Sequence, residues 1–164
     1  MREDIKRTFR RNLDYFRNLT TDIPDELKAS QPAPGINHAV WITGHLISSF
    51  QALGGEMAID SWLPEWWFAR FGTGSVPDAE QADDLPKRVL LAVFDDAARR
   101  ITNRLAAMSD TDPDAPLPDV RYRDVFPTLG TAALHILAVH MAIHLGQLST
   151  WRRMVDLPRV VDPL

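Results

Sequence analysis

The 164-residue sequence contains no cysteine. Disulfides, thiolate nucleophiles and cysteine-ligated zinc sites are therefore excluded, so that any metal ion in this protein needs histidine or carboxylate ligands. The absence of cysteine also fits a cytoplasmic protein, because structural disulfides are rare in that compartment. We expect a cytoplasmic localisation.

The sequence also lacks a concentration of positive charge. Its 18 basic residues are scattered among 22 acidic residues, which gives a net charge of −4. Proteins that bind nucleic acids usually gather lysine and arginine into a basic patch or stripe. We therefore expect no nucleic-acid partner.

Runs typical of signal peptides and membrane spans are missing too. The first six residues carry charge where a secretory signal needs an apolar run. The stretch 129–148 has no formal charge, but it contains three histidines, Gln147 and several small or polar residues. We interpret it as a buried core helix and expect no membrane partner.

The bulk composition indicates one ordinary globular domain. Hydrophobic residues make up 45% and charged residues 24% of the chain, which is close to average usage. A chain of this length is the size of a single domain with one core. The sequence therefore predicts one domain over residues 1–164.

Apolar residues recur at helical spacing in four long segments, and no segment shows the alternation of a β-strand. The segments are 3–20, 38–55, 84–108 and 128–157. Proline-rich or glycine-rich connections separate them. This pattern predicts an all-α fold, a four-helix bundle, whose interior is a usual place for metal ligands.

Polar residues mark the expected helix starts. Asn37 can cap the second helix, Asp83 or Asp84 the third, and Thr128 the fourth. In the third helix, the predicted buried stripe consists of Val89, Leu90, Val93, Ala97, Ile101, Leu105 and Met108.

The connection between the second and third helices, residues 60–83, is rich in aromatic residues. They are Trp62, Trp66, Trp67, Phe68 and Phe71, and irregular chain is expected to follow at 72–77. A long aromatic loop can form part of a binding site, or it can cover the open end of a helical core. The sequence favours neither interpretation.

The fourth helix contains two histidines four residues apart, His140 and His144, within a segment free of proline from 128 to 157. An α-helix places both rings on one side, one turn apart, as in helical metal-ligand pairs. His135 is five residues before His140, and regular helical geometry predicts that it faces elsewhere. The pair is the clearest chemical feature of the chain.

A third histidine on the second helix, His45, can complete a three-nitrogen site that leaves coordination positions open. The residue before it, Gly44, has no side chain and would let another helix approach closely. His38 lies about 10 Å further along the helix axis. A capping contact explains His38 sufficiently, and we choose His45 as the third ligand.

Two segments, Trp41-Ile42-Thr43-Gly44-His45-Leu46 and His140-Met141-Ala142-Ile143-His144-Leu145-Gly146-Gln147-Leu148, resemble the signature segments of the DinB-like (DinB/YfiT) superfamily. The resemblance implies an up-up-down-down four-helix bundle, often a homodimer. It also implies a divalent metal ion on one histidine of the second helix and two of the last, which here are His45, His140 and His144.

The characterised members of that superfamily include metal-dependent transferases that use low-molecular-weight thiols and a maleylpyruvate isomerase, while many members have no assigned reaction. The resemblance therefore implies a metal-dependent enzyme acting on a small molecule, as a thiol-dependent transferase or a hydrolase. Histidine ligation does not choose among nickel, zinc, iron and manganese. Two alternatives remain: a binding or stress-response module without turnover, and a dimerisation unit with structural histidines.

The sequence does not place a general base. Three carboxylates are conceivable, although we prefer to interpret them as surface residues: Asp14, Asp60 and Glu65. Gln147 can orient a ligand or make a packing hydrogen bond. The arginines at 152–153 can hold a substrate carboxylate, but their position also suits the helix dipole, which we prefer.

Overall fold

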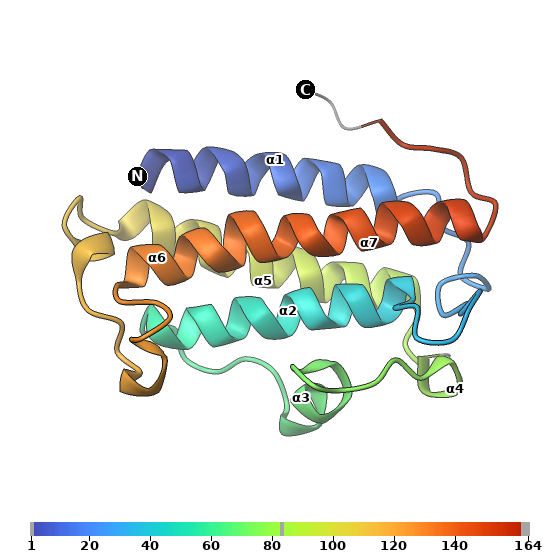
Figure 1. Ribbon diagram of the computed structural model, residues 1–164, viewed down its shortest axis with the longest axis horizontal. Helices are drawn as coiled ribbons and strands as arrows, with labels where there is room; N and C mark the ends of the chain where they lie inside the picture. Colours follow the sequence, from blue (N-terminus) through green and yellow to red (C-terminus); the bar gives the residue numbers. More distant parts are fainter. Residues whose placement is uncertain (1, 83, 162–164) are drawn as a thin grey trace.

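The computed structural model describes residues 2–82 and 84–161, and within these ranges the chain folds as helices without a β-strand. Four long helices lie side by side (Figure 1). They are α1 (Arg2–Thr20), α2 (Ala39–Glu56), α5 (Lys87–Ala107) and a last helix from Leu129 to Met154. The predicted all-α fold is confirmed.

The last helix consists of three consecutive segments: α6 (Leu129–Leu134), the π-helical segment η3 (His135–His140) and α7 (Met141–Met154). Thr128 caps it as predicted, and Thr131 bonds back to the Thr128 backbone to complete a capping box. No feature of the sequence predicted the π-helical segment, which ends at His140, the first histidine of the pair.

The long helices run in two opposite directions: α1 and α7 run one way, and α2 and α5 run the other way (Figure 1). Lys87 at the start of α5 donates to the carbonyl of Ile23, just after α1, at 2.6 Å. Arg104 near the end of α5 donates to the carbonyl of Met57, just after α2, at 2.7 Å. The order is therefore up-down-down-up, and the up-up-down-down order implied by the resemblance is wrong.

The two connections around α2 explain this order. Residues 21–38 turn back at the end of α1, where the N–H of Val40 donates to the carbonyl of Lys28 at 3.1 Å, so α2 starts beside the end of α1. Residues 57–86 then run back along the bundle, so α5 starts at the same end as α2 (Figure 1). The connection between α5 and α6 contains η1 (Asp112–Asp114) and η2 (Val120–Tyr122).

The aromatic connection is partly helical, since it forms α3 (Glu65–Phe71) directly after Pro64 and the short α4 (Ala79–Ala82). Trp67 and Phe71 are buried, whereas Trp66 is 51% exposed. The aromatic loop expected at 60–83 is thus wrong where α3 and α4 form. Trp67 and Phe71 pack against the middle of α2 at Gly44, while Phe71 also lines a cavity, so both interpretations of this connection stay open.

The start of α2 differs from the prediction by one residue. His38, and not Asn37, is the cap, because its Nδ1 accepts the N–H of Trp41 at 3.2 Å. The capping contact proposed for His38 is therefore confirmed. Asn37 instead donates to the side chain of Gln147 on α7.

The cap of α5 comes from a residue distant in sequence. The N–H of Lys87 donates to Oδ1 of Asp25 at 2.9 Å. Asp84, one of the two predicted caps, forms an ion pair with Arg70 at 2.8 Å instead, and Asp83 lies outside the described residues. A side chain that arrives from another part of the chain leaves no local sequence signal.

The core lies between the four long helices. In α5 it contains Leu90, Ala97, Ile101 and Leu105 of the predicted stripe, together with Phe94, whose ring stacks on Phe16 of α1. Val89 is 36% exposed, which corrects its assignment to the stripe. Within the described residues the buried apolar side chains form one cluster, and the single domain over residues 1–164 stays a prediction.

The helix Leu129–Met154 is long and apolar enough to cross a membrane by length and composition, although 44% of its most apolar window is buried. Core helices of soluble proteins pass the same test. Here Leu137, Met141, Leu145 and Leu148 are buried in the core. The segment thus serves as the predicted core helix, while its opposite face is exposed.

Candidate metal centre

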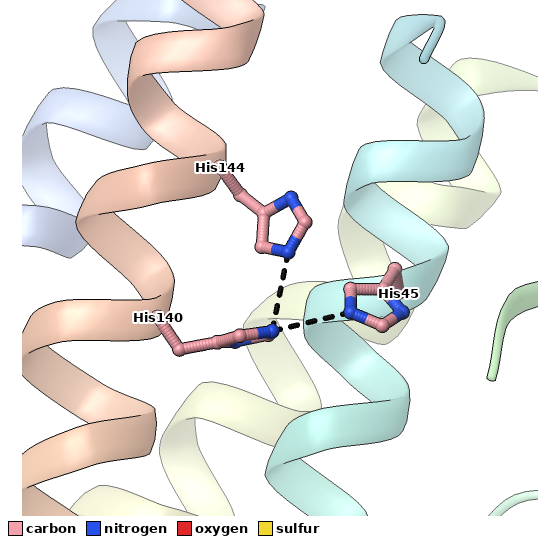
Figure 2. A group of neighbouring side chains, drawn as sticks. All are labelled: His45, His140 and His144. Atoms are coloured by element: carbon pink, nitrogen blue, oxygen red, sulfur yellow. Dashed lines mark hydrogen bonds between the residues drawn. The ribbon is translucent and has the colours of Figure 1, made fainter. Parts of the chain in front are cut away.

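Three histidines from two helices converge at the middle of the bundle (Figure 2). His45 comes from α2, His140 ends η3 and His144 lies in the first turn of α7. The Nε2 atom of His140 is 3.2 Å from Nε2 of His45 and 3.1 Å from Nε2 of His144. The structure therefore brings together all three residues that the sequence singled out.

These separations suit a shared metal ion. Histidine nitrogens bind zinc at about 2.0–2.1 Å, so two ligands at octahedral or tetrahedral angles are roughly 2.8–3.4 Å apart. The ligand atoms of His45, His140 and His144 all lie within 4.8 Å of one another. The three side chains are positioned to hold a divalent ion.

His45 is held by the aromatic connection. Its Nδ1 donates to the carbonyl of Phe71 at 2.8 Å, which leaves Nε2 free to bind a metal. The ring of Trp41 stacks on His45 with centroids 4.7 Å apart. Trp67 donates to the carbonyl of Gly44 at 3.1 Å, so α3 is the helix that approaches α2 at this glycine.

His144 is held by an amide on its own helix. Its Nδ1 lies 2.9 Å from Oε1 of Gln147, an oxygen that also accepts from Asn37 at 3.3 Å. Because the amide oxygen can only accept, Nδ1 of His144 carries the proton and Nε2 is free. Gln147 therefore orients a candidate ligand, which is one of the two roles that the sequence suggested.

His140 differs from the other two histidines. Its Nδ1 is buried and has no hydrogen-bond partner among the described residues. The ring of His135 lies 6.0 Å from that of His140, centroid to centroid. The prediction that His135 faces elsewhere is wrong, because a π-helical turn brings residues five positions apart onto one face.

All three histidines have a lowered pKa. Burial is the main cause, and it lowers the pKa of His140 to about 3 and that of His144 to about 4, while the pKa of His45 is also lowered. The neighbouring imidazoles lower the pKa of His140 and His144 further. At neutral pH the rings are therefore uncharged, which is the form that binds metal ions.

The family model of the DinB superfamily matches residues 8–148, a range that includes all three histidines. The chain belongs to the DinB superfamily. None of the curated proteins matches this DinB superfamily member. The family therefore accounts for the helical fold and the histidine pattern, and the chemistry must be argued from the site itself.

The structure places the three candidate carboxylates on the surface of this DinB superfamily protein. Asp14, Asp60 and Glu65 are exposed, and Asp14 pairs with Arg17. In the described part of the chain, the only group of three or more potential ligands is the histidine cluster. The cluster thus contains no carboxylate base from this part of the chain.

Arg152 has a structural role. It is 1% exposed, it pairs with Asp22 at 2.8 Å, and it donates to the carbonyls of Leu19 and Pro158. Its two Nη groups therefore join the end of α7 to the end of α1, while its buried Nε has no hydrogen-bond partner in the described structure. This contact explains Arg152 better than either a substrate carboxylate or the helix dipole.

Two cavities adjoin the residues that hold the histidines. One of about 560 Å³ is lined by Trp41 and Phe71, which contact His45. The other, of about 340 Å³, is lined by Asn37 and Gln147 on the side of His144. None of the three histidines lines either cavity, so each cavity adjoins the cluster through residues that contact a histidine.

Proposed function

We propose that this DinB superfamily protein is a metal-dependent enzyme that acts on a small molecule, with a divalent ion on His45, His140 and His144. The observation that carries the proposal is that Nε2 of His140 lies 3.2 Å from Nε2 of His45 and 3.1 Å from Nε2 of His144. Three protein ligands leave positions open for substrate, as in catalytic metal sites. Nickel, zinc, iron and manganese all suit imidazole ligands.

A divalent ion on three neutral ligands keeps its full charge, and its role is to lower the pKa of a thiol or water. The protein prepares its side chains for this role. Burial keeps the three imidazoles uncharged, and the Phe71 carbonyl and the Gln147 amide fix the ring tautomers of His45 and His144.

Thiol transfer is our first choice of reaction. The described part of the chain brings no carboxylate into the cluster, and a thiol needs less help to ionise than water, with an ordinary pKa of about 8.5 against 15.7. In this reaction the thiol loses its proton to solvent, and its sulfur forms a bond to an electrophilic carbon. The leaving group departs with the electron pair of the broken bond. Hydrolysis of an ester or amide is the second choice.

The electrophile has a candidate binding place in the larger cavity. Its volume of about 560 Å³ is in the usual range for small-molecule sites. Trp41 and Phe71 supply apolar walls, while Arg70 and Asp78 supply charge. Trp41 also stacks on His45, so a ligand in this cavity would contact a residue that packs directly on a candidate metal ligand.

A binding module without turnover is the second candidate function. The same lack of a carboxylate in the described cluster supports it, since capture of a ligand needs no base. The two functions differ in a direct way, because the module gains thermal stability from its ligand without forming a product.

The first experiment is to measure metal content by mass spectrometry on protein without a histidine tag. We expect about one equivalent in the parent and none in the His140→Ala/His144→Ala variant. His135→Ala is the matched control, because its ring lies near His140 but outside the ligand group, and it should retain the metal. A parent that binds no divalent ion after reconstitution would rule out the proposal.

The second experiment screens low-molecular-weight thiols against electrophiles, and esters against water, with the metal identified in the first. For an enzyme, His144→Ala abolishes turnover while circular dichroism shows an intact fold. For a structural clamp, chelation lowers the melting temperature strongly and no product forms under any condition.

A further inference from the structure

Asn12 on α1 makes a specific contact with the π-helical segment η3. Its side-chain Nδ2 donates to the carbonyl of Leu137 at 3.0 Å and to the carbonyl of Ala138 at 3.2 Å. The side-chain amide of asparagine has two N–H donors and can serve both oxygens. Asn12 thus joins α1 to the turn that leads into His140.

The π-helical turn explains why these carbonyls accept a side chain. In a regular α-helix the N–H of Met141 would donate to the carbonyl of Leu137. Here it reaches the carbonyls of Ile136 and Ala138 instead. The Leu137 carbonyl loses its helical donor, and a buried carbonyl without a partner is costly. Asn12 supplies the missing donor.

His140 depends on this turn more than the other two histidines depend on their helices. His45 and His144 are oriented through Nδ1, by the Phe71 carbonyl and the Gln147 amide respectively. Nδ1 of His140 has no such partner in the described structure. Its ring direction therefore follows from the backbone of η3.

We infer that Asn12 is a positioning residue for the metal centre: its amide holds the π-helical turn that directs Nε2 of His140 toward His45 and His144. The inference rests on the proposed metal site. The contact between the rings of His135 and His140 reports the turn, because five residues of regular α-helix would place them about 140° apart.

The test replaces Asn12 with leucine, which has a similar size and no donor. Cobalt(II) affinity is measured by competition with a chelator, together with the visible absorption spectrum of the bound ion. We expect Asn12→Leu to bind cobalt(II) roughly 10- to 100-fold more weakly, which is the usual effect of losing a residue that supports a metal ligand without binding the metal. We also expect the absorption spectrum of the bound ion to change. Asn12→Gln, which keeps both donors, should recover part of the affinity.

The matched control is Asn18→Leu, the same replacement at an exposed position of α1, which should bind as the parent does. A second readout needs no metal: a nuclear Overhauser effect between the His135 and His140 rings, present in the parent and lost in Asn12→Leu. If Asn12→Leu does not fold, Asn12→Ala takes its place.

Parent-like affinity, spectrum and ring contact in Asn12→Leu would overturn the inference while the proposed function stood. If the parent itself binds no cobalt, the proposed function fails, and the ring contact then decides separately whether Asn12 sets the position of His140. Persistence of that contact in Asn12→Leu would overturn the inference in this case too.

Discussion

Phe71 holds His45 with its backbone and covers Gly44 with its ring. The Phe71 carbonyl accepts from Nδ1 of His45 at 2.8 Å, while a Cβ atom at Gly44 would lie 2.4 Å from Cγ of Phe71. The absence of a side chain at Gly44 therefore fixes the distance between α2 and α3. That distance in turn makes the Phe71 carbonyl available to a candidate metal ligand.

Gly44→Ala is expected to displace Phe71 and weaken its hydrogen bond to His45. Overpacking of this kind costs about 1–3 kcal/mol of stability. Loss of the hydrogen-bond partner of a metal-binding histidine lowers metal affinity roughly 10- to 100-fold. Urea denaturation and chelator competition measure the two effects.

The control is Gly55→Ala in the same helix, where an added Cβ meets no atom within 4 Å. This change should be neutral or stabilising by about 0.5–1 kcal/mol, because alanine is the better helix former, and it should leave metal affinity unchanged. Equal effects of the two substitutions would contradict the role assigned to Gly44.

The metal-free protein should lose stability as the pH falls from 6.5 toward 4. The pKa of His140 is lowered from 6.5 to about 3 and that of His144 to about 4. The unfolded chain therefore binds more protons than the folded chain between these values, so acid favours unfolding. The contribution of the two rings is fully present above pH 6.5.

Denaturant titrations at pH 7 and pH 4.5 test this expectation. The free energy of unfolding should fall more steeply with acid in the parent than in a His140→Gln/His144→Gln variant, which cannot take up these protons. The carboxylates are common to both proteins, so their titration cancels in the comparison. The same slope in both would show that the two histidines do not contribute.

The ion pair between Asp22 and Arg152 should be a major local source of stability. Asp22→Ala leaves the guanidinium of Arg152, which is 1% exposed, without its carboxylate. Because the Asp22 side chain is itself 48% exposed, we expect a loss of about 1–3 kcal/mol, the cost of leaving a buried donor without its partner. Thermal and chemical unfolding measure the loss.

Arg153→Ala is the matched control at the next residue, which is exposed. It should change stability by no more than about 0.5 kcal/mol. Because Asp22 and Arg152 act on the fold, metal content should be the same in both variants. A stable Asp22→Ala protein that has lost activity would instead revive the substrate-binding interpretation of Arg152.

The homodimer implied by the resemblance stays a prediction, and the outward face of the last helix is the place to test it. Val139 is 49% and Ile143 is 53% exposed there. We expect light scattering to show a dimer for the parent and a monomer for Ile143→Lys, since a buried lysine in the interface is unfavourable. Val120→Lys, exposed on η2, should remain dimeric. A monomeric parent would contradict the expectation.

The helical pattern of the sequence predicted the fold class well, because burying one face of each helix requires apolar residues at helical spacing. The cap at Thr128 could also be predicted from the sequence, since Thr128 and Thr131 are close in sequence. The starts of α2 and α5 were harder to predict. His38 and Asn37 are both plausible caps from the sequence, and Asp25 reaches Lys87 from 62 residues away.

The cytoplasmic localisation remains a prediction.

The candidate ligands themselves were determined by the sequence. Two histidines four residues apart share one side of a helix whatever surrounds them, so His140 and His144 form a pair by local geometry alone. His45 followed from the resemblance and from its place on a second apolar helix.

The tertiary structure alone decided how those ligands are held. Phe71, Gln147 and Asn12 act through a carbonyl, an amide oxygen and an amide nitrogen. Such groups occur throughout any sequence, and only packing brings the Phe71 carbonyl to α2 and Asn12 to η3. The π-helical turn that draws His135 beside His140 is likewise a product of packing, because local propensity favours the regular α-helix and contacts from α1 are needed to satisfy the carbonyls that the turn releases.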